Sequence, residues 1–447
     1  MVLAIPALKR VFSGVLVITG GVFLLSCGGS SSPTTPPSGL KFRAFVSQNV
    51  SATTASPGLI IIDAQLDRIG AGSTISAGPS PGTMVEPANH LLTLVANTSD
   101  NEVDVVNNAQ ESSSGKVSLP GSTESMAVTT DATVGFAAVP TAPVAGLAPG
   151  EVEVINLSSI ALEAPVPNCP VPPAPQTVTN CLSGARYLVL SPDNTHLLIF
   201  GDNPNALAVA DLTNLGTTTS PNWAVTNTNQ VSSAQLDHPV WATFSPDGGT
   251  AYILSCGGEC GGTTASVTPM TFTAAGPQCT RDCLGATTAL PGGATYSVGS
   301  GNTVYVAGSA QCSGGANPIS CGKLTVLNTS GNTVQVVKSV TITDGYHSRM
   351  VVTADNQVFI GALGCTQIFN STVQRGCLSI YNANNGHAVI GSDPGEVTGI
   401  TAVSGRPQVY VIQNGELRNW TTTTDTPAPS QHQIDIVGQA VDVVLAD

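Results

Sequence analysis

Short runs of valine, isoleucine and leucine alternate with turns rich in glycine, asparagine, aspartate and proline along the chain after residue 40. Runs of this kind predict β-strands, and helical periodicity is almost absent from the same region. The order of the runs repeats at roughly 40 to 60 residues, which is the period of propeller blades once loop insertions are allowed. Each unit reads as an inner strand, a turn, a second strand, a loop, a third strand and an outer fourth strand. The pattern predicts an all-β protein with the β-propeller fold.

The number of units follows from two independent sets of strands. The inner strands are expected to begin near Thr83, Ser125, Arg186, Val240, Thr295, Arg349, Val397 and Ala440. Second strands also number eight, and the two counts agree only if the last inner strand, AVDVVLAD (440–447), joins RAFVSQN (43–49) in one unit. We therefore expect eight four-stranded blades, with the C-terminal strand pairing with N-terminal strands to close the ring and protect its edges. Seven blades are the alternative, if one weak unit is absorbed.

Three strand patterns resemble a known family. They are LTLVANTSDNEVDVVN (92–107), GEVEVINL (150–157) and TVYVAGS (303–309). In these repeats the chain is similar to the YVTN-repeat, lactonase-like β-propellers, and the resemblance covers roughly residues 40 to 447. The resemblance implies the propeller fold but says little about activity, because propellers host many unrelated activities. No catalytic motif of an enzymatic relative is matched, so no catalytic residue is assigned.

The N-terminus reads as an export signal. Lys9 and Arg10 precede an apolar run from Val11 to Leu25, which suits a signal peptide and is short for a membrane span. The run ends in Leu-Leu-Ser-Cys27, which resembles the lipobox of bacterial lipoproteins. That resemblance implies acylation of Cys27 after removal of residues 1–26, and Gly28 beside it favours the outer membrane. The alternative is an ordinary signal peptide with a chance cysteine.

A tether and a single domain are expected to follow. Residues 27–39 are rich in glycine, serine and proline, which predicts a disordered spacer, and residues 40–447 form the propeller domain. Cleavage would leave 12 basic and 28 acidic residues, a formal charge of −16. Because no cluster of cations is present to neutralise phosphates, nucleic acid is not expected as a partner. The expected partners are the membrane, through the lipid, and an envelope protein, a glycan or a small molecule.

Ten cysteines remain when Cys27 is set aside, an even number that suits disulfides in an oxidising compartment. Nearest-neighbour pairing, one preference among many possible schemes, gives Cys169 with Cys181, Cys256 with Cys260, Cys279 with Cys283, Cys312 with Cys321, and Cys365 with Cys377. A zinc site made by the close pairs in CGGEC (256–260) and CTRDC (279–283) is the alternative. The strand order disfavours it because it places the two motifs on opposite faces. Neither a metal nor a cofactor is expected.

Long insertions and polar residues gather on one face of the predicted ring. Second-to-third strand loops at 140–150, 255–264, 309–322 and 364–377 lie there, together with the blade-to-blade link at 164–181. Residues just before the inner strands should line the channel mouth on the same face. The candidate ligand site there consists of Glu124, Arg186, His238, His347, Arg349 and Glu396, flanked by Thr83 and Gln439. Alternatively, these side chains are solvated or paired with one another at a wet mouth.

Two functional hypotheses follow. The first is a lipid-anchored cell-envelope binding module that acts through its loop-rich, disulfide-bonded face. The second is an envelope hydrolase of the lactonase type, in which arginines bind an anionic group and histidines supply acid–base chemistry at the mouth. Redox work by the CxxxC pairs is disfavoured because the spacing is not CxxC. The aromatic and methionine residues that follow in register, Met84, Met126, Tyr187, Trp241, Tyr296 and Met350, are expected to pack between blades.

Overall fold

The computed structural model divides the chain into Met1–Thr34 and Thr35–Asp447, and only the second unit is described. Within it the described residues are 35–49, 56–72, 74–144, 148–166, 182–217, 220–272, 283–310, 321–331, 333–370, 372–429 and 431–447. The predicted signal peptide and Cys27 lie outside these ranges. The described part begins before residue 40, and it already contacts the propeller there: the backbone N–H and the hydroxyl of Ser38 donate hydrogen bonds to the Glu111 carboxylate at 2.6 and 2.5 Å.

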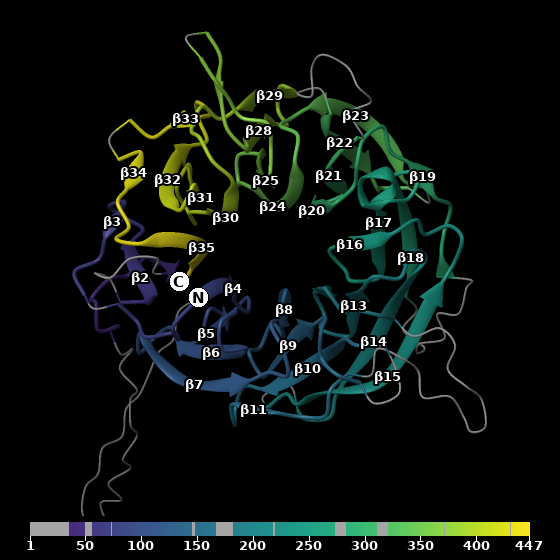
Figure 1. Ribbon diagram of the computed structural model, residues 1–447, viewed down its shortest axis with the longest axis horizontal. Coiled ribbons are helices and arrows are strands. Elements are labelled where there is room, and N and C mark those ends of the chain that lie inside the picture. Colours follow the sequence, from purple (N-terminus) through teal and green to yellow (C-terminus); the bar gives the residue numbers. More distant parts are fainter. Residues whose placement is uncertain are drawn as a thin grey trace, which may run out of the picture. The chain divides into compact units, whose positions relative to one another are not determined.

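Eight antiparallel sheets stand around a common centre, so the predicted eight-bladed β-propeller is confirmed (Figure 1). Among the described residues, seven of these sheets have four strands and one has five, and a separate two-stranded hairpin is inserted in one blade. In the view down the ring the inner strands, such as β4, β16, β24 and β35, face the centre and the outer strands, such as β7, β15 and β23, form the rim.

The first four blades follow one another along the chain. Blade 1 contains β4 (Pro81–Val85), β5 (Leu92–Asn97), β6 (Glu102–Asn107) and β7 (Ser112–Ser118). Blade 2 contains β8 (Ser125–Val128), β9 (Val134–Val139), β10 (Glu151–Asn156) and β11 (Ala161–Leu162). Blade 3 contains β12 (Tyr187–Leu190), β13 (His196–Phe200), β14 (Ala206–Asn214) and β15 (Trp223–Ser232). Blade 4 contains β16 (Pro239–Phe244), β17 (Thr250–Ser255), β18 (Ser266–Thr271) and β19 (Thr288–Ala289), with the short 3-10 helix η1 (Gly257–Cys260) after β17.

The remaining blades complete the ring. Blade 5 contains β20 (Tyr296–Ser300), β21 (Thr303–Ser309), β22 (Gly322–Asn328) and β23 (Gln335–Thr341). Blade 6 contains β24 (Tyr346–Val352), β25 (Gln357–Leu363), β28 (Leu378–Asn382) and β29 (His387–Ile390), and carries the hairpin β26 (Ile368–Phe369) and β27 (Gln374–Arg375). Blade 7 contains β30 (Val397–Ala402), β31 (Gln408–Gln413), β32 (Glu416–Thr421), β33 (Thr426–Pro427) and β34 (Gln433–Ile434). Blade 8 contains β35 (Gln439–Leu445), β1 (Arg43–Asn49), β2 (Gly58–Asp63) and β3 (Arg68–Ile69).

Blade 8 closes the ring with strands from both ends of the domain, as the strand count predicted. Strand β35 pairs with β1 in antiparallel register, with Phe45 opposite Val444 and Val46 opposite Val443. The N–H of Asp442 also donates a hydrogen bond of 3.0 Å to the Ser47 hydroxyl. Buried aliphatic and aromatic side chains of β1 and β35, including Phe45, Val46 and Val443, fill the cores on the two sides of this sheet. The pairing therefore satisfies the edges of both strands.

Aspartates in the turns between first and second strands shape those turns. In blade 3 one Asp193 carboxylate oxygen accepts hydrogen bonds from the Ser191 hydroxyl at 2.6 Å and from the Thr195 N–H and hydroxyl at 3.1 and 2.8 Å. Asp131 and Asp247 form the corresponding bonds in blades 2 and 4. This is the local side-chain to backbone bonding that favours aspartate in tight turns.

The long insertions follow second strands, as predicted, and the ends of these strands lie at one face of the ring. They connect β9 to β10, β17 to β18, β21 to β22 and β25 to β28. Two predicted disulfides are present there, Cys256 with Cys260 and Cys365 with Cys377. Cys283 and Cys321 are also disulfide-bonded, whereas Cys169, Cys181, Cys279 and Cys312 lie outside the described residues. We call this side of the propeller the loop-rich face.

Candidate functional site

A cavity of about 250 Å³ lies on the ring axis, where all eight inner strands contribute side chains. Its wall is rich in large side chains: Met84, Met126, Tyr187, Trp241, Tyr296 and Tyr346. Tyr346 begins strand β24 and Glu124 directly precedes β8, so the cavity reaches the end of the inner strands that lies at the loop-rich face. We call it the axial cavity.

An arc of four aromatic side chains dominates one side of the axial cavity. The rings of Trp241 and Tyr296 are stacked, with centroids 4.4 Å apart and planes at 27°, and Tyr187 meets the Trp241 ring edge-on at 6.4 Å. The Tyr187 and Tyr346 hydroxyls are 3.1 Å apart and share a hydrogen bond. Burial raises the pKa of Tyr346, so its hydroxyl stays protonated in neutral solution. The arc offers flat apolar surface together with two hydroxyl groups.

Two opposite charges lie in the cavity wall. Arg349 donates from Nε to the Thr398 carbonyl at 2.8 Å and from Nη1 to the Ser348 carbonyl at 2.9 Å, which fixes its guanidinium. Asp442 is 6% exposed and accepts hydrogen bonds from the N–H groups of Met84 and Val443, each at 2.9 Å. Burial raises the pKa of Asp442, and the positive charge of Arg349 acts in the opposite direction. The wall thus carries one fixed cation and one enclosed carboxyl group.

Glu124 and Arg186 are paired at the mouth of the axial cavity. Arg186 Nη1 lies 2.8 and 3.0 Å from the two oxygens of Glu124, and its Nε lies 2.5 Å from an oxygen of Asp202. Glu124 lines the cavity, while Arg186 turns to these two carboxylates. The pairing across blades 2 and 3 leaves Arg186 already engaged by two anions, which makes it a poor receptor for an anionic ligand.

The two histidines take different positions. His347 lines the cavity but is fully buried, and its Nε2 donates to the Thr343 carbonyl at 3.0 Å, whereas Nδ1 has no partner among the described residues. Burial lowers the pKa of His347 to about 4, so the ring is neutral. His238 lies outside the cavity lining, with Nδ1 2.9 Å from an Asp237 oxygen. The two rings therefore do not meet at one reaction point.

Asp237 and Glu259 hold the loop closed by the Cys256–Cys260 disulfide. One Asp237 oxygen accepts hydrogen bonds from the N–H groups of Thr263 and Thr264 at 2.7 and 2.9 Å, and these bonds keep its pKa low although partial burial opposes them. Glu259, inside the disulfide turn, accepts a 2.8 Å hydrogen bond from the Ser309 N–H of blade 5. Burial raises the pKa of Glu259 to about 7, despite that bond. The turn therefore braces blade 4 against blade 5.

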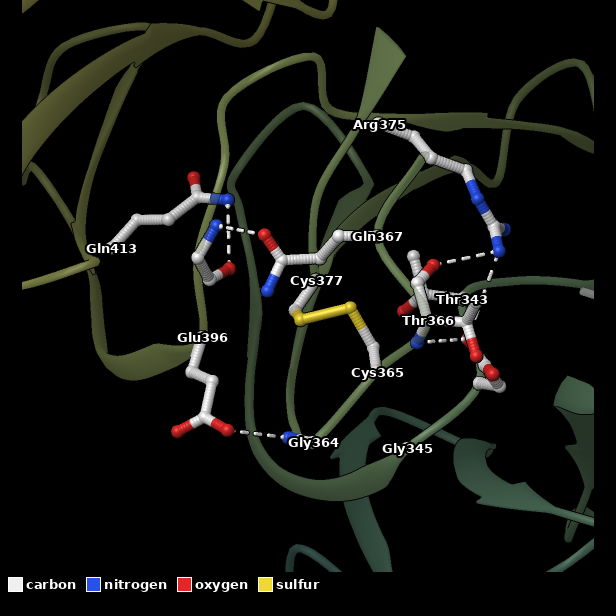
Figure 2. The surroundings of a disulfide bond; sticks show 12 residues. Thr343, Gly345, Gly364, Cys365, Thr366, Gln367, Arg375, Cys377, Glu396 and Gln413 are labelled. Carbon is white, nitrogen blue, oxygen red and sulfur yellow. Dashed lines mark hydrogen bonds and ion pairs between the residues drawn. A yellow bond between two sulfur atoms is a disulfide. The ribbon is translucent and has the colours of Figure 1, made fainter. Parts of the chain in front are cut away.

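Glu396 lies by the second described disulfide, away from the axial cavity. Its carboxylate accepts a 2.9 Å hydrogen bond from the N–H of Gly364, next to Cys365 (Figure 2). Gln367 and Gln413 lie on the same side of the disulfide as Glu396, and Arg375 lies on the other side. Of the six predicted site residues, the structure brings Glu124, His347 and Arg349 to the axial cavity, with Arg186 joined to Glu124. His238 and Glu396 occupy other parts of the loop-rich face.

Sequence reasoning missed Tyr346 and Asp442, and it interpreted Tyr187, Trp241 and Tyr296 as packing residues only. The aromatic side chains do pack on blade cores, yet they also line the axial cavity. A register shift in β24 between His347 and Arg349 changes which side chains point to the axis, and β16 and β30 have the same irregularity. Strict alternation cannot predict such bulges. The available signal in the sequence was Tyr346 itself, an aromatic residue at the start of an inner strand, three positions before Arg349.

Within the described ranges, no group of three or more histidine, cysteine, aspartate or glutamate side chains could hold a metal ion. Those residues also contain no helix that is long and apolar enough to cross a membrane.

No family model matches the chain, and no curated protein matches it either. Solved structures do match, over most of the chain. The dihydro-heme d1 dehydrogenase NirN in complex with DHE is 12% identical, with a TM-score of 0.58, over 92% of this chain and 75% of that chain. A functionally unknown protein from Desulfotomaculum acetoxidans is 13% identical, with a TM-score of 0.52, over 91% and 98%.

A lactonase is also among the matches. The periplasmic gluconolactonase of Pseudomonas aeruginosa is 13% identical, with a TM-score of 0.47, over 90% of this chain and 98% of that chain. The two similarities with TM-scores above 0.5 show the fold alone, and the function has to be argued from the site.

Proposed function

We propose that this protein is a cell-envelope binding module for a hydroxyl-rich, glycan-type ligand, which it takes at the axial cavity and the loop-rich face. The aromatic arc carries the proposal: Trp241 stacked on Tyr296 beside the hydroxyl pair of Tyr187 and Tyr346. Apolar C–H faces of sugar rings pack on such aromatic faces, while their hydroxyl groups need nearby donors and acceptors. Tyr187, Tyr346 and the carboxylate of Glu124 supply both.

The size and charge of the axial cavity support a small neutral unit. Its volume of about 250 Å³ is below the range of about 300–1,000 Å³ that is usual for drug-sized ligands, so one ring suits it better than an extended molecule. Arg349 and Asp442 place opposite charges in the wall, and Arg186 is engaged by two carboxylates. A strongly anionic ligand would meet one available arginine, Arg349, in a wall that also contains the carboxyl groups of Asp442 and Glu124.

Hydrolysis of the lactonase type is less well supported by the same geometry. It requires an acid–base group in reach of the reacting carbonyl. His347 is fully buried and neutral, and His238 is bonded to Asp237 outside the cavity lining. Binding needs no such group, so the binding module is the function that the site supports best.

Display at the cell envelope remains part of the proposal. The N-terminal apolar run and the lipobox-like end at Cys27 support it, and so do the two described disulfides on the loop-rich face, which are typical of oxidising compartments. Mass spectrometry of the membrane fraction would test acylation of Cys27. An unmodified cysteine, or a mature chain that begins after residue 27, would contradict the anchor.

The binding proposal is tested with the full-length protein in detergent on an array of neutral and N-acetylated glycans, followed by calorimetry. Replacing Trp241 with alanine should weaken binding about 30-fold, which corresponds to the roughly 2 kcal/mol lost at an aromatic hot spot. Trp241 is half-buried and donates its indole N–H to the Ser297 carbonyl at 3.3 Å. Trp223→Ala is the matched control, because Trp223 on the outer strand β15 is also half-buried and donates its indole N–H to Asp131 at 2.7 Å. Absence of binding to every glycan, or equal loss in both variants, would overturn the proposal.

A further inference from the structure

A second cleft, of about 500 Å³, opens between blades 7 and 8. Its wall contains the end of β1, the loop after β25, the residues that lead into and begin β30, the turn after β31 and the first residues of β35. All of these lie at the loop-rich end of their strands. The side chains are strongly polar: Asn49, Gln367, Glu396, Thr398, Asn414 and Gln439. We call it the amide cleft, because four of these six side chains are carboxamides.

Most of these polar groups have unused hydrogen-bonding capacity. Gln367 accepts a 2.8 Å hydrogen bond from the Gly395 N–H through Oε1, while its Nε2 has no partner among the described residues (Figure 2). No side-chain hydrogen bond is present for Asn414 or Gln439 within the same residues, and the Thr398 hydroxyl is buried without one. Gln367, Asn414 and Gln439 are exposed, so their unpaired donors and acceptors are open to water and to a polar ligand that displaces it. Among the described side chains of this lining, only the Thr398 hydroxyl is enclosed without a partner, which is the pattern of a group that is completed by a ligand or by ordered water.

The walls of the amide cleft are held rigidly. The Cys365–Cys377 disulfide closes the loop that carries Gln367, and the Glu396 carboxylate is bonded to the Gly364 N–H of that loop. Asn414 has a φ of 55°, and the adjacent wall at Gly395 is so close that a Cβ atom there would lie 2.2 Å from the Cβ of Asn414. A preformed cleft loses less entropy when it binds a ligand.

One residue separates the two sites. The Thr398 carbonyl accepts the hydrogen bond from Arg349 Nε in the wall of the axial cavity, while Thr398 itself lines the amide cleft. A chain-like ligand seated on the aromatic arc could therefore continue across the mouth into the amide cleft. Carboxamides and hydroxyls offer donors and acceptors together, which is the pattern that the hydroxyl and acetamido groups of sugars match. Glu396 is the one ionisable side chain in the lining of this cleft, as far as the structure describes it.

We infer that the amide cleft is a second sugar subsite and that the ligand is an oligosaccharide of at least two units, with one unit in the axial cavity. This inference rests on the proposed glycan-binding function. The probes are glucose and N-acetylglucosamine and their β-1,4-linked di- and trisaccharides, titrated by calorimetry into the full-length protein. In at least one series the disaccharide should bind at least tenfold more tightly than the monosaccharide.

Two double variants locate the second subsite. The first, Asn414→Gly with Gln439→Ala, removes two carboxamides from the cleft. Glycine is used at position 414 because it accepts the positive φ there. Without these two side chains, the ratio of the monosaccharide Kd to the disaccharide Kd should fall towards one. Partial unfolding of the variant weakens the apparent binding of both sugars equally, so it does not change this ratio. The control, Asn89→Ala with Gln110→Ala, removes two exposed amides from turns on the opposite face and should leave the ratio unchanged.

The possible failures are distinguishable. A monosaccharide that binds in a Trp241-dependent way without any gain for longer chains would refute the second subsite and leave the binding module intact. A gain with length that persists in the Asn414/Gln439 variant would also refute the assignment of the subsite to this cleft. If no sugar of either series or of the glycan array binds, the proposed function itself fails.

Discussion

Glu259 makes the stability of the propeller depend on pH in an unusual direction. Its carboxyl group is enclosed by the disulfide turn and by blade 5, where it lies against Gly293 and accepts the Ser309 N–H. Burial raises its pKa from 4.5 to about 7. Because the folded protein holds this proton more tightly than the unfolded chain, the carboxyl contributes most at low pH. Its contribution is lost as the pH rises from about 4.5 to about 7.

The size of the effect follows from the pKa. At about 1.4 kcal/mol per pKa unit, the rise to about 7 corresponds to about 3 kcal/mol of lost stability above neutral pH. Solvent that still reaches the carboxyl reduces this to about 2 kcal/mol. Glutamine keeps an oxygen for the Ser309 N–H but never ionises. Glu259→Gln should therefore be about 2 kcal/mol more stable than the parent protein at pH 8.5 and equal to it within about 0.5 kcal/mol at pH 4.5.

Urea unfolding of both proteins at five pH values between 4.5 and 8.5 measures this difference. Burial also raises the pKa of Glu86 and of Asp104, each to about 6, but both groups are present in the two proteins and cancel in the comparison. The exposed Glu163, changed to glutamine, is the matched control and should give a difference near zero at every pH. A Glu259→Gln difference that stays constant with pH, or that favours the parent protein at pH 8.5, would refute the reasoning.

Two further predictions concern the loop-rich face and the ring closure. Replacing Cys365 and Cys377 with alanine should lower the free energy of unfolding by about 3 kcal/mol, as expected for opening a covalent loop of this length. Urea titration with and without reductant checks this, because the variant has lost this bond and reductant should destabilise it less than the parent protein. Phe45→Ala on β1 should lower the free energy of unfolding by about 3–5 kcal/mol, because the ring is fully buried beside the closing strand. The control, Val337→Ala on the outer strand β23, should lower it by less than about 0.5 kcal/mol, because that side chain is 64% exposed. Equal losses in urea unfolding would contradict the assigned core.

The blade order could be predicted because it depends on local signals. Strand runs, turn aspartates such as Asp193 and the matching of β1 with β35 are all visible in the order of residues. The ring also needs only nearest-neighbour packing between blades. Two cysteine pairs close in sequence were predictable for the same reason, since a short loop keeps their sulfur atoms near each other.

The candidate site was predicted in part, because its geometry depends on features that alternation does not encode. The bulge between His347 and Arg349 carries the imidazole into the wall, whereas Tyr346 reaches across to Tyr187. The pairing of Arg186 with Glu124 joins residues 62 positions apart and depends on how two blades are set against each other. The amide cleft brings Asn49 together with Asn414, and uncharged side chains of this kind carry no distinctive signal in a single sequence.

The closing strand also sets the folding problem of the chain. The bond between Asp442 and Ser47 joins residues 395 positions apart, so closure is a contact of very high sequence separation and is expected to form late and slowly. Until β35 arrives, β1 presents an open strand edge to any other chain. If two chains meet in that interval, the β35 of each can complete the ring of the other. The structure that seals the monomer therefore also provides a route to a strand-exchanged dimer, and dilution during refolding should suppress it.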